Sequence, residues 1–186
     1  MVAGSEIYIA HKSEDGRQQP LRDHLEGVGR IAAAYAAVFD AQAHAYRVGI
    51  LHDIGKYSKA GQRRMRDPEH TAKVDHSTAG AIVADQMKDR FSALAIAGHH
   101  SGLMDLGSRL SAQNDGTLMG RLGKALVGDF DYAAWQTEIS VPNENVYPSW
   151  LDPKDRFCIR CRPSRRRRCR SRPVRGERVE IRRQPS

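Results

Sequence analysis

Two polar side chains, His52 and Asp53, stand next to each other at the end of a segment that otherwise reads as an apolar helix. Imidazole nitrogens and carboxylate oxygens are the ligands that divalent metals such as Mn, Fe, Co, Ni and Zn accept in proteins. Asp53 has two oxygens with which it could bridge a pair of ions. Because burying such a pair is costly unless its charge is compensated, metal binding would explain its position.

The histidines are grouped in one part of the chain, since all eight lie in the first 100 residues. Five of them sit at or near the ends of expected helices, each beside an apolar stripe: His24, His52, His76, His99 and His100. This placement lets several helices direct imidazoles to one point. A lone histidine is more often a core or surface group than a ligand, but this ordered series is far more specific. We interpret His11, His44 and His70, which lack matching neighbours, as structural or solvent-facing.

The elements that must position these side chains are expected to be helices, because residues 1–155 form amphipathic segments separated by Gly, Pro, Asp and Asn. Pro20 is expected in the first turn of a helix, and Asp75 is expected to cap a later one. The apolar stripe of the first helix is Leu21, Leu25, Val28, Ile31, Tyr35 and Val38. The other expected helices cover 41–52, 79–87, 91–97, 118–127 and 132–138, and a loop covers 141–150. No strand series or internal repeat is present, so the sequence predicts an all-α fold.

The net charge of +8 is not spread evenly along the chain. Residues 156–186 contain 13 Arg and 2 Glu, a net of +11. Subtracting these from the totals of 30 Lys+Arg and 22 Asp+Glu leaves 17 and 20, a net of −3, for residues 1–155. We therefore expect one globular domain over 1–155 and a disordered tail over 156–186 that is rich in Arg, Pro, Ser and Cys.

The tail contains all three cysteines, Cys158, Cys161 and Cys169. Their spacing could supply half of a zinc site, but the second half is missing because no histidine follows residue 100. The arginines could bind phosphates non-specifically. The abrupt change of composition near residue 156 is also what an out-of-frame reading of a GC-rich gene would produce. A disordered basic tail and an out-of-frame reading therefore both stay open as interpretations of residues 156–186.

The order His24, His52-Asp53, His76 and His99-His100 resembles the HD superfamily of metal-dependent phosphohydrolases. More narrowly, four stretches of this sequence resemble the HD nuclease domain of the CRISPR-associated nuclease-helicase of type I interference. They are "RDHLEGVGRIAAAYA", "GILHDIGKYSKAGQ", "VDHSTAGA" and "AGHHSGL". The similarity covers about residues 5–130. It implies an HD-type helical bundle with a two-metal centre that cleaves single-stranded DNA by phosphodiester hydrolysis.

The resemblance also implies roles for individual residues. The implied metal ligands are His24, the central pair His52 and Asp53, and, for the second ion, His76, His99 and His100. Lys56 matches a basic residue near the scissile phosphate, so Asp53 and Lys56 are the expected catalytic residues. The implied cofactors are two divalent ions from among Mn, Ni, Co, Fe and Mg. The implied partners are single-stranded DNA, a separate helicase subunit and the RNA-guided surveillance complex of this antiviral defence.

This sequence lacks one metal-binding residue of the family pattern. The family completes its metal site with an aspartate on a later helix, and no similar motif occurs in residues 101–186. Asp129 and Asp131 are the nearest acidic candidates, but their surroundings do not match, and neither is assigned as a ligand. Two alternatives therefore stay open: an HD phosphohydrolase of small nucleotides, and a catalytically impaired remnant.

Two other classes of protein are disfavoured. The longest apolar run, residues 31–39, is about half of the roughly 20 residues that a membrane span needs, so we expect a cytoplasmic protein without a membrane partner. Gly49 and Gly55-Lys56 are spaced wrongly for the phosphate-binding loop of an ATP-driven motor, and Tyr57 stands where that loop requires Ser or Thr.

Overall fold

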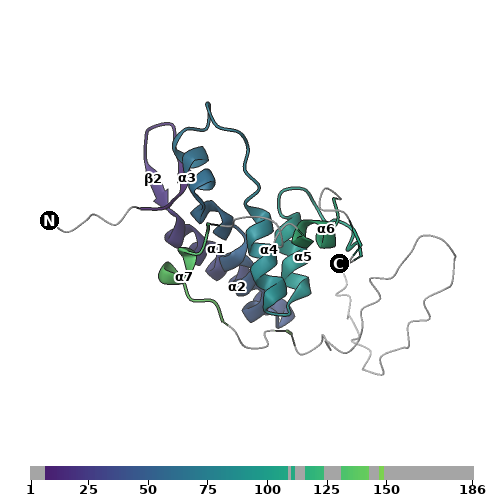
Figure 1. The fold of residues 1–186 in the computed structure, drawn as a ribbon. Coiled ribbons are helices and arrows are strands. Elements are labelled where there is room, and N and C mark those ends of the chain that lie inside the picture. The colour runs from purple at the N-terminus through teal and green to yellow at the C-terminus, as the bar shows by residue number, and fades with distance from the viewer. Residues whose placement is uncertain (1–6, 109, 112–115, 124–130, 143–146, 149–186) are drawn as a thin grey trace, which may run out of the picture. The chain divides into compact units, whose positions relative to one another are not determined.

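The computed structural model describes residues 7–108, 110–111, 116–123, 131–142 and 147–148. Helices dominate these residues, which confirms the expected all-α class (Figure 1). The expectations for the tail 156–186 and its cysteines, and for Asp129, fall outside the described residues. Within the described ranges, no helix has both the length and the apolar character that a membrane crossing requires.

A short β-hairpin precedes the first helix and is not predicted by the sequence. β1 (Ile9–Lys12) pairs antiparallel with β2 (Gln18–Pro20), and the register places His11 opposite Gln19. Gly16 lies in the connecting turn with a φ of +85°, which glycine adopts without strain. The two strands are too short to show the alternating pattern by which a sheet is predicted.

The first two helices pack mainly on each other. α1 (Leu21–Ala36) leads through the 3₁₀ turn η1 (Ala37–Phe39) into α2 (Gln42–Leu51). Pro20 lies immediately before α1 in an extended conformation, so its expected place in the first turn is wrong by one residue. Asp23 does lie in the first turn, where a carboxylate is favoured by the helix dipole.

The apolar stripe of α1 is buried only at its beginning. Leu21 and Leu25 are fully buried, whereas Tyr35 and Val38 are 77% and 80% exposed. The end of the stripe therefore faces solvent in the described structure. The buried half is the half that carries His24.

A further helix, which the sequence analysis missed, follows the His52-Asp53 pair. The chain continues from α2 through the 3₁₀ turn η2 (Ile54–Tyr57) into α3 (Lys59–Arg66). Ser58 caps α3 by accepting a hydrogen bond from the backbone N–H of Gly61. The segment 59–66 has a single large apolar side chain, Met65, so no stripe reveals the helix.

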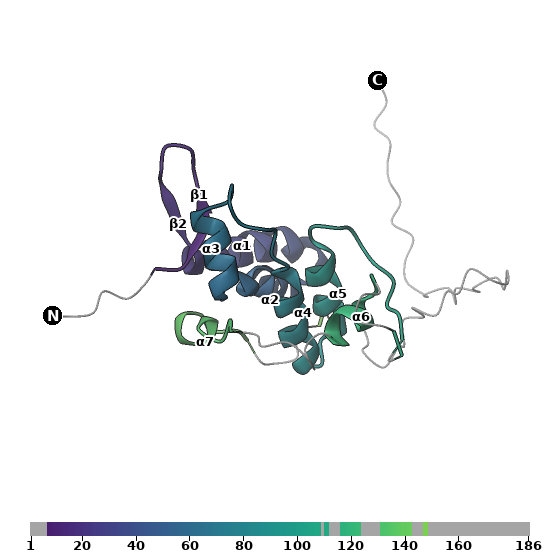
Figure 2. The ribbon, with the colours of Figure 1, turned by 45° about the horizontal axis from the view of Figure 1, so that its top comes forward.

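The next two helices, α4 (Ser77–Gln86) and α5 (Arg90–Gly98), lie side by side (Figures 1 and 2). Asp75 accepts a hydrogen bond from the backbone N–H of Thr78 at 3.1 Å, which is the capping role predicted for it. Asp89 caps α5 in the same way through Ser92. Beyond α5 the chain turns at Gly102, whose φ is +80°.

Two short helices complete the described structure. α6 (Leu118–Gly123) contacts α4 and α5, and α7 (Trp135–Glu138) follows a turn. The predictions over 118–127 and 132–138 are right in type, but α7 begins three residues later than expected and residues 124–127 lie outside the described ranges. Beneath these elements lies one buried core, which includes Leu21, Leu25, Ile50, Leu51, Ile54, Ile96 and Leu118.

Candidate metal centre

The ends of four helices meet at Asp53. His24 lies in the first turn of α1, the pair His52-Asp53 directly follows α2, His76 directly precedes α4, and His99-His100 directly follows α5. The structure thus brings together all six residues that the sequence analysis assigned as ligands. A side chain at a helix end can point along the axis instead of into a neighbouring helix, so several of them can share one small space.

Glycines allow these helix ends to approach one another. A Cβ atom on Gly55 would lie 2.3 Å from the carbonyl oxygen of His76, and a Cβ atom on Gly80 would lie 2.1 Å from that of Leu51. Both distances are far shorter than any real contact of a Cβ atom. The sequence "HDIGK" therefore needs its glycine for close packing of the backbone that carries His76 against the backbone that follows Asp53.

The first group of candidate ligands consists of His24, His52 and Asp53 and is called the His24 group below. The Nε2 atoms of His24 and His52 lie 3.5 and 3.4 Å from Oδ2 of Asp53. The same two nitrogens are 3.3 Å apart.

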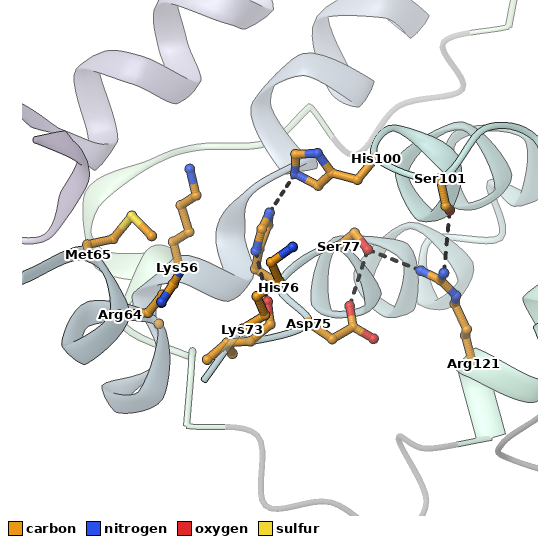
Figure 3. Close-up of a pocket in the computed structure, with 12 residues that line it drawn as sticks. Lys56, Arg64, Met65, Lys73, Asp75, His76, Ser77, His100, Ser101 and Arg121 are labelled. Atoms are coloured by element: carbon orange, nitrogen blue, oxygen red, sulfur yellow. Dashed lines mark hydrogen bonds between the residues drawn. The ribbon is translucent and has the colours of Figure 1, made fainter. Parts of the chain in front are cut away.

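The second group consists of Asp53, His76, His99 and His100 and is called the His76 group. Oδ1 of Asp53 lies 3.2 Å from Nε2 of His76 and 3.3 Å from Nε2 of His99. Nε2 of His76 lies 2.8 Å from Nε2 of His100 (Figure 3). Asp53 therefore presents one carboxylate oxygen to each group.

These separations are close to those of ligand atoms around a single ion. Two ligand atoms about 2.1 Å from one ion lie about 3.0 Å apart at a right angle and about 3.4 Å apart in a tetrahedron. The atoms of the His24 group are 3.3 to 3.5 Å apart, and the contacts of the His76 group given above are 2.8 to 3.3 Å. Both groups have the size that a metal ion requires.

The orientation of the imidazoles also fits a cation. Three rings place Nδ1 against a backbone carbonyl oxygen: His52 against Gly49 at 2.6 Å, His76 against Val74 at 3.1 Å and His99 against Ile96 at 2.7 Å. Because a carbonyl can only accept, Nδ1 carries the hydrogen and the neutral ring presents a lone pair at Nε2. These lone pairs point at a carboxylate whose buried Oδ1 has no hydrogen-bond partner among the described residues. A divalent cation in each ligand group would satisfy these lone pairs and the carboxylate.

The electrostatics favour the ligand state of Asp53 and His100 and disfavour that of His99. Burial alone would raise the pKa of Asp53, but interactions with the surrounding imidazoles outweigh burial and hold that pKa far below its usual range. Burial and the neighbouring imidazoles of His99 and His76 lower the pKa of His100. Burial lowers the pKa of His99, but the adjacent Asp53 carboxylate outweighs it and raises that pKa overall. An ionised aspartate and neutral imidazoles are the forms that bind metal, so a metal must compete with a proton at His99.

Lys56 is buried, with 5% of its surface exposed, and is not a solvated side chain at a helix end. Its Nζ lies 2.8 Å from Oδ2 of Asp53 and donates a hydrogen bond to the carbonyl oxygen of Ala10 at 3.2 Å. The ammonium group thus compensates part of the charge of Asp53. The expected contact of Lys56 with a substrate phosphate stays a prediction.

A cavity of about 620 Å³ opens beside the His76 group (Figure 3). His76 and His100 form part of its wall, and four cationic side chains also line it: Lys56, Arg64, Lys73 and Arg121. The sequence analysis missed the last three, because they lie outside the histidine motifs. The arginines of "RRMR" in α3 are the one sequence signal for this basic wall.

Two of the three remaining histidines, His44 and His70, lie apart from both ligand groups. His70 is exposed beside Asp67, and His44 is packed near Asp89 and stacked on Tyr147, in agreement with their interpretation. His11 is exposed, but its ring lies edge-on to that of His24 with a centroid distance of 4.8 Å, which the sequence does not reveal.

Asp131 lies within the described residues, unlike Asp129, and its carboxylate contacts the start of α3. Its Oδ2 accepts a hydrogen bond from the backbone N–H of Lys59 at 3.0 Å, so it caps the start of α3. Asp131 belongs to neither ligand group, which agrees with the decision not to assign it as a ligand.

The comparison with known families agrees with this arrangement. A family model described as the HD domain matches residues 21–133, more than half of the chain. The chain belongs to the HD domain family. The matched range contains every residue of both ligand groups, and members of this family are metal-dependent hydrolases. A search of curated proteins found no match.

Proposed function

We propose that this HD domain is a metal-dependent phosphodiesterase that cleaves single-stranded DNA, as expected for the nuclease of type I CRISPR interference. The observation that carries the proposal is the division of one carboxylate between two sets of imidazoles. Oδ2 of Asp53 faces His24 and His52, and Oδ1 faces His76 and His99. A bridging carboxylate is what a pair of ions acting on one phosphate would need.

The residues of the chain would divide the work as follows. The His24 group would hold one divalent ion and the His76 group a second, with Mn, Ni, Co, Fe or Mg as candidates. When bound, such ions activate a water molecule and stabilise the charge that develops on the phosphate. The backbone carbonyls bonded to Nδ1 fix the orientation of His52, His76 and His99. Lys56 holds Oδ2 of Asp53 in place.

The cavity beside the His76 group supports an anionic substrate. Lys56, Arg64, Lys73 and Arg121 give its wall a positive charge, although residues 1–155 carry a net charge of −3. A concentration of positive charge around a cleft draws phosphate groups toward it. The local charge of this cavity is therefore opposite in sign to the net charge of residues 1–155.

The test of the proposal is the replacement of His52 by alanine. We expect His52→Ala to abolish degradation of single-stranded DNA with added Mn or Ni, because it removes a ligand while deleting little of the core. Helix content, measured by circular dichroism, should be nearly unchanged. His70→Ala, an exposed histidine away from the centre, is the matched control and should keep full activity. Wild-type activity of His52→Ala would show that the site is wrongly assigned.

A second candidate function is the hydrolysis of small nucleotides. The same ligands would serve it, and a cavity of about 620 Å³ is within the range of about 300 to 1,000 Å³ that is typical of small-molecule sites. A substrate panel separates the two functions. Hydrolysis of mononucleotides with single-stranded DNA left intact would rule out the nuclease.

A catalytically impaired remnant is the third candidate. It is favoured by the missing late aspartate, since Asp131 caps α3 and does not reach the centre. Calorimetric titration with Mn or Ni distinguishes it, because a remnant should bind one ion weakly or none. A helicase subunit and the surveillance complex are proposed partners of the nuclease, and their genes beside the gene of this chain would support that part of the proposal.

A further inference from the structure

The cavity beside the His76 group contains more positive charge than the metal centre uses. Of its four cationic residues, Lys56 is bound to Asp53. The other three come from separate segments: Arg64 from α3, Lys73 from the connection between α3 and α4, and Arg121 from α6. Their meeting at one cavity is produced by the fold and is not a run of neighbouring charges in the sequence.

Arg121 is held in place by neutral groups. Its guanidinium donates to Oγ of Ser77 at 3.2 Å and to Oγ of Ser101 at 3.5 Å (Figure 3). It also donates to the carbonyl oxygen of Ala97 at 3.1 Å. Within the described ranges, none of its contacts is an ion pair with a carboxylate. Oγ of Ser77 donates in turn to Oδ1 of Asp75 at 3.2 Å, so the guanidinium is linked to a carboxylate through one hydroxyl group but makes no direct ion pair with it (Figure 3). Arg121 therefore keeps a positive charge at the cavity wall with which it can bind a phosphate.

Arg64 and Lys73 complete this basic wall. Arg64 donates to the backbone carbonyls of Pro68 and Thr71, which orient its guanidinium without neutralising it. Lys73 is exposed. The acidic residue of the wall, Asp75, uses its carboxylate to accept hydrogen bonds from Thr78 at the start of α4.

The cavity reaches the centre from one side. It is lined by His76 and His100 of the second ligand group, and neither His24 nor His52 is among its lining residues. A phosphate held by ions in the two ligand groups would therefore have the basic wall next to it on the His76 side. The volume of about 620 Å³ leaves room for more than that phosphate alone.

We propose that Arg64, Lys73 and Arg121 bind a second phosphate of the substrate, next to the one that is cleaved. The substrate class is then a flexible chain with at least two phosphodiester groups, namely a single-stranded nucleic acid. A mononucleotide would leave the basic wall unused. This inference rests on the proposed function and adds to it a side of entry and a determinant of specificity.

Lysine acetylation provides a direct test, because the arginine-rich tail 156–186 contains no lysine and cannot contribute to the signal. The full chain would be treated with a limiting amount of an acetylating reagent in EDTA, so that no cleavage occurs. Acetylation of Lys73 and Lys59 would be followed by mass spectrometry with and without octathymidylate. Lys59 is also exposed but lies on the wall of a different cavity, so it is an internal control.

We expect octathymidylate to slow the acetylation of Lys73 several-fold and to leave Lys59 unchanged. Thymidine monophosphate, at the same concentration of phosphate, should protect Lys73 much less. Equal acetylation of Lys73 with and without saturating octathymidylate would overturn the proposal. Equal protection of Lys73 and Lys59 would overturn it as well, since it would indicate non-specific shielding.

Kinetics provide a second and independent readout. Lys73→Gln should raise KM for octathymidylate by about five- to ten-fold with little change in kcat. Lys73→Arg should have a KM close to that of the wild type. Cleavage of bis(p-nitrophenyl) phosphate, which has one phosphate, should be affected much less by Lys73→Gln than cleavage of octathymidylate. Lys59→Gln is the matched control. An equal effect on both substrates would point to a structural role and contradict the proposal.

The outcomes also separate this inference from the proposed function. If His52→Ala abolishes cleavage but Lys73 is not protected, the nuclease stands and the second phosphate site fails. If Lys73 is protected but His52→Ala cleaves as well as the wild type, the basic wall binds nucleic acid and the assigned metal centre is wrong.

Discussion

Asp53 combines two roles that are normally tested separately. It is a candidate ligand of both groups, and it is also the partner of a buried ammonium group, that of Lys56. The two residues are 3% and 5% exposed. Removing Asp53 leaves the buried ammonium group of Lys56 without its anionic partner, and removing Lys56 leaves the buried carboxylate with imidazoles alone. Either loss destabilises the folded state more strongly than the loss of a surface pair.

We therefore expect a double-mutant cycle to show strong coupling in the absence of metal. Asp53→Ala should lower the free energy of unfolding by about 3–5 kcal/mol, and Lys56→Met should lower it by a similar amount. The double variant should be destabilised by clearly less than the sum. Urea denaturation followed by circular dichroism measures all three values. Additive effects would contradict the buried pair, and Asp67→Ala, an exposed aspartate, is the control.

The sequence predicts the ligands at this scale and little of what surrounds them. The histidine series is recognisable because each member adjoins a helix end and an apolar stripe. The pairing of Lys56 with Asp53 and the contact of His11 with His24 depend on the fold. Arg121 is 68 positions away from Asp53 in the sequence, and no local pattern connects the two.

At the scale of the elements, the fit between helix ends depends on backbone atoms that nearly touch. Gly55 lies against the carbonyl group of His76, and this contact determines how the start of α4 approaches Asp53. The sequence predicts the helices with apolar stripes. It does not predict α3, in which Met65 is the single large apolar side chain, or the β-hairpin, whose strands have four and three residues.

Gly55→Ala should disturb the His76 group specifically. The added methyl group would lie 2.3 Å from the carbonyl oxygen of His76, so the backbone must shift at a cost of about 1–3 kcal/mol. We expect lower stability in urea and weaker binding of Ni in calorimetry. Gly27→Ala is the control, because no atom lies within 4 Å of its added Cβ and its position inside α1 favours alanine. Equal behaviour of the two variants would argue against this contact.

A hydrogen bond across the domain connects α7 to the core. The hydroxyl group of Tyr57, in η2, donates to Oε2 of Glu138 at 2.7 Å. Burial, and then the carboxylate of Glu138, raise the pKa of Tyr57 above its usual value. The folded state therefore binds this proton more tightly than the unfolded state. The resulting stability is complete below the unfolded pKa of about 10 and is lost as the pH rises through the folded pKa.

Tyr57→Phe should reveal this contribution. At neutral pH we expect it to lower the free energy of unfolding by about 0.5–1.5 kcal/mol, the value of one hydrogen bond. Above about pH 10 the wild type should lose stability more steeply than Tyr57→Phe, and the difference between them should shrink. Urea denaturation at a series of pH values measures both. A constant difference up to pH 12 would exclude the titration of Tyr57 as its cause.

At the scale of the whole molecule, composition separates two regions of opposite charge, −3 for residues 1–155 and +11 for residues 156–186. Among the described residues, both ligand groups of the candidate centre lie in the first region. The general attraction to nucleic acid is expected mainly from the second. This division is readable from the sequence because it depends on counts of charged residues and not on their arrangement in space.

Deleting residues 156–186 should therefore leave the metal stoichiometry unchanged. It should weaken only the salt-sensitive part of DNA binding. If half of the 13 arginines neutralise phosphates, the logarithm of affinity should fall with the logarithm of salt concentration with a slope of roughly −4 to −6. The shortened chain should show a much shallower slope. Affinity measured against salt for both proteins tests this expectation, and loss of metal from the shortened chain would mean that the tail supplies ligands.

The carboxylate that lies between the two ligand groups also makes them thermodynamically dependent on each other. A cation at one oxygen of Asp53 restricts the rotation of the carboxylate and withdraws electron density from the other oxygen. If a metal ion in one group changes the affinity of the other group for its ion by some factor, an ion in the second group must change the affinity of the first by the same factor. A substitution of His24 should thus alter the affinity of the His76 group for a metal ion, although it leaves His76, His99 and His100 unchanged. Cooperativity between the two ligand groups would then depend on one side chain, that of Asp53.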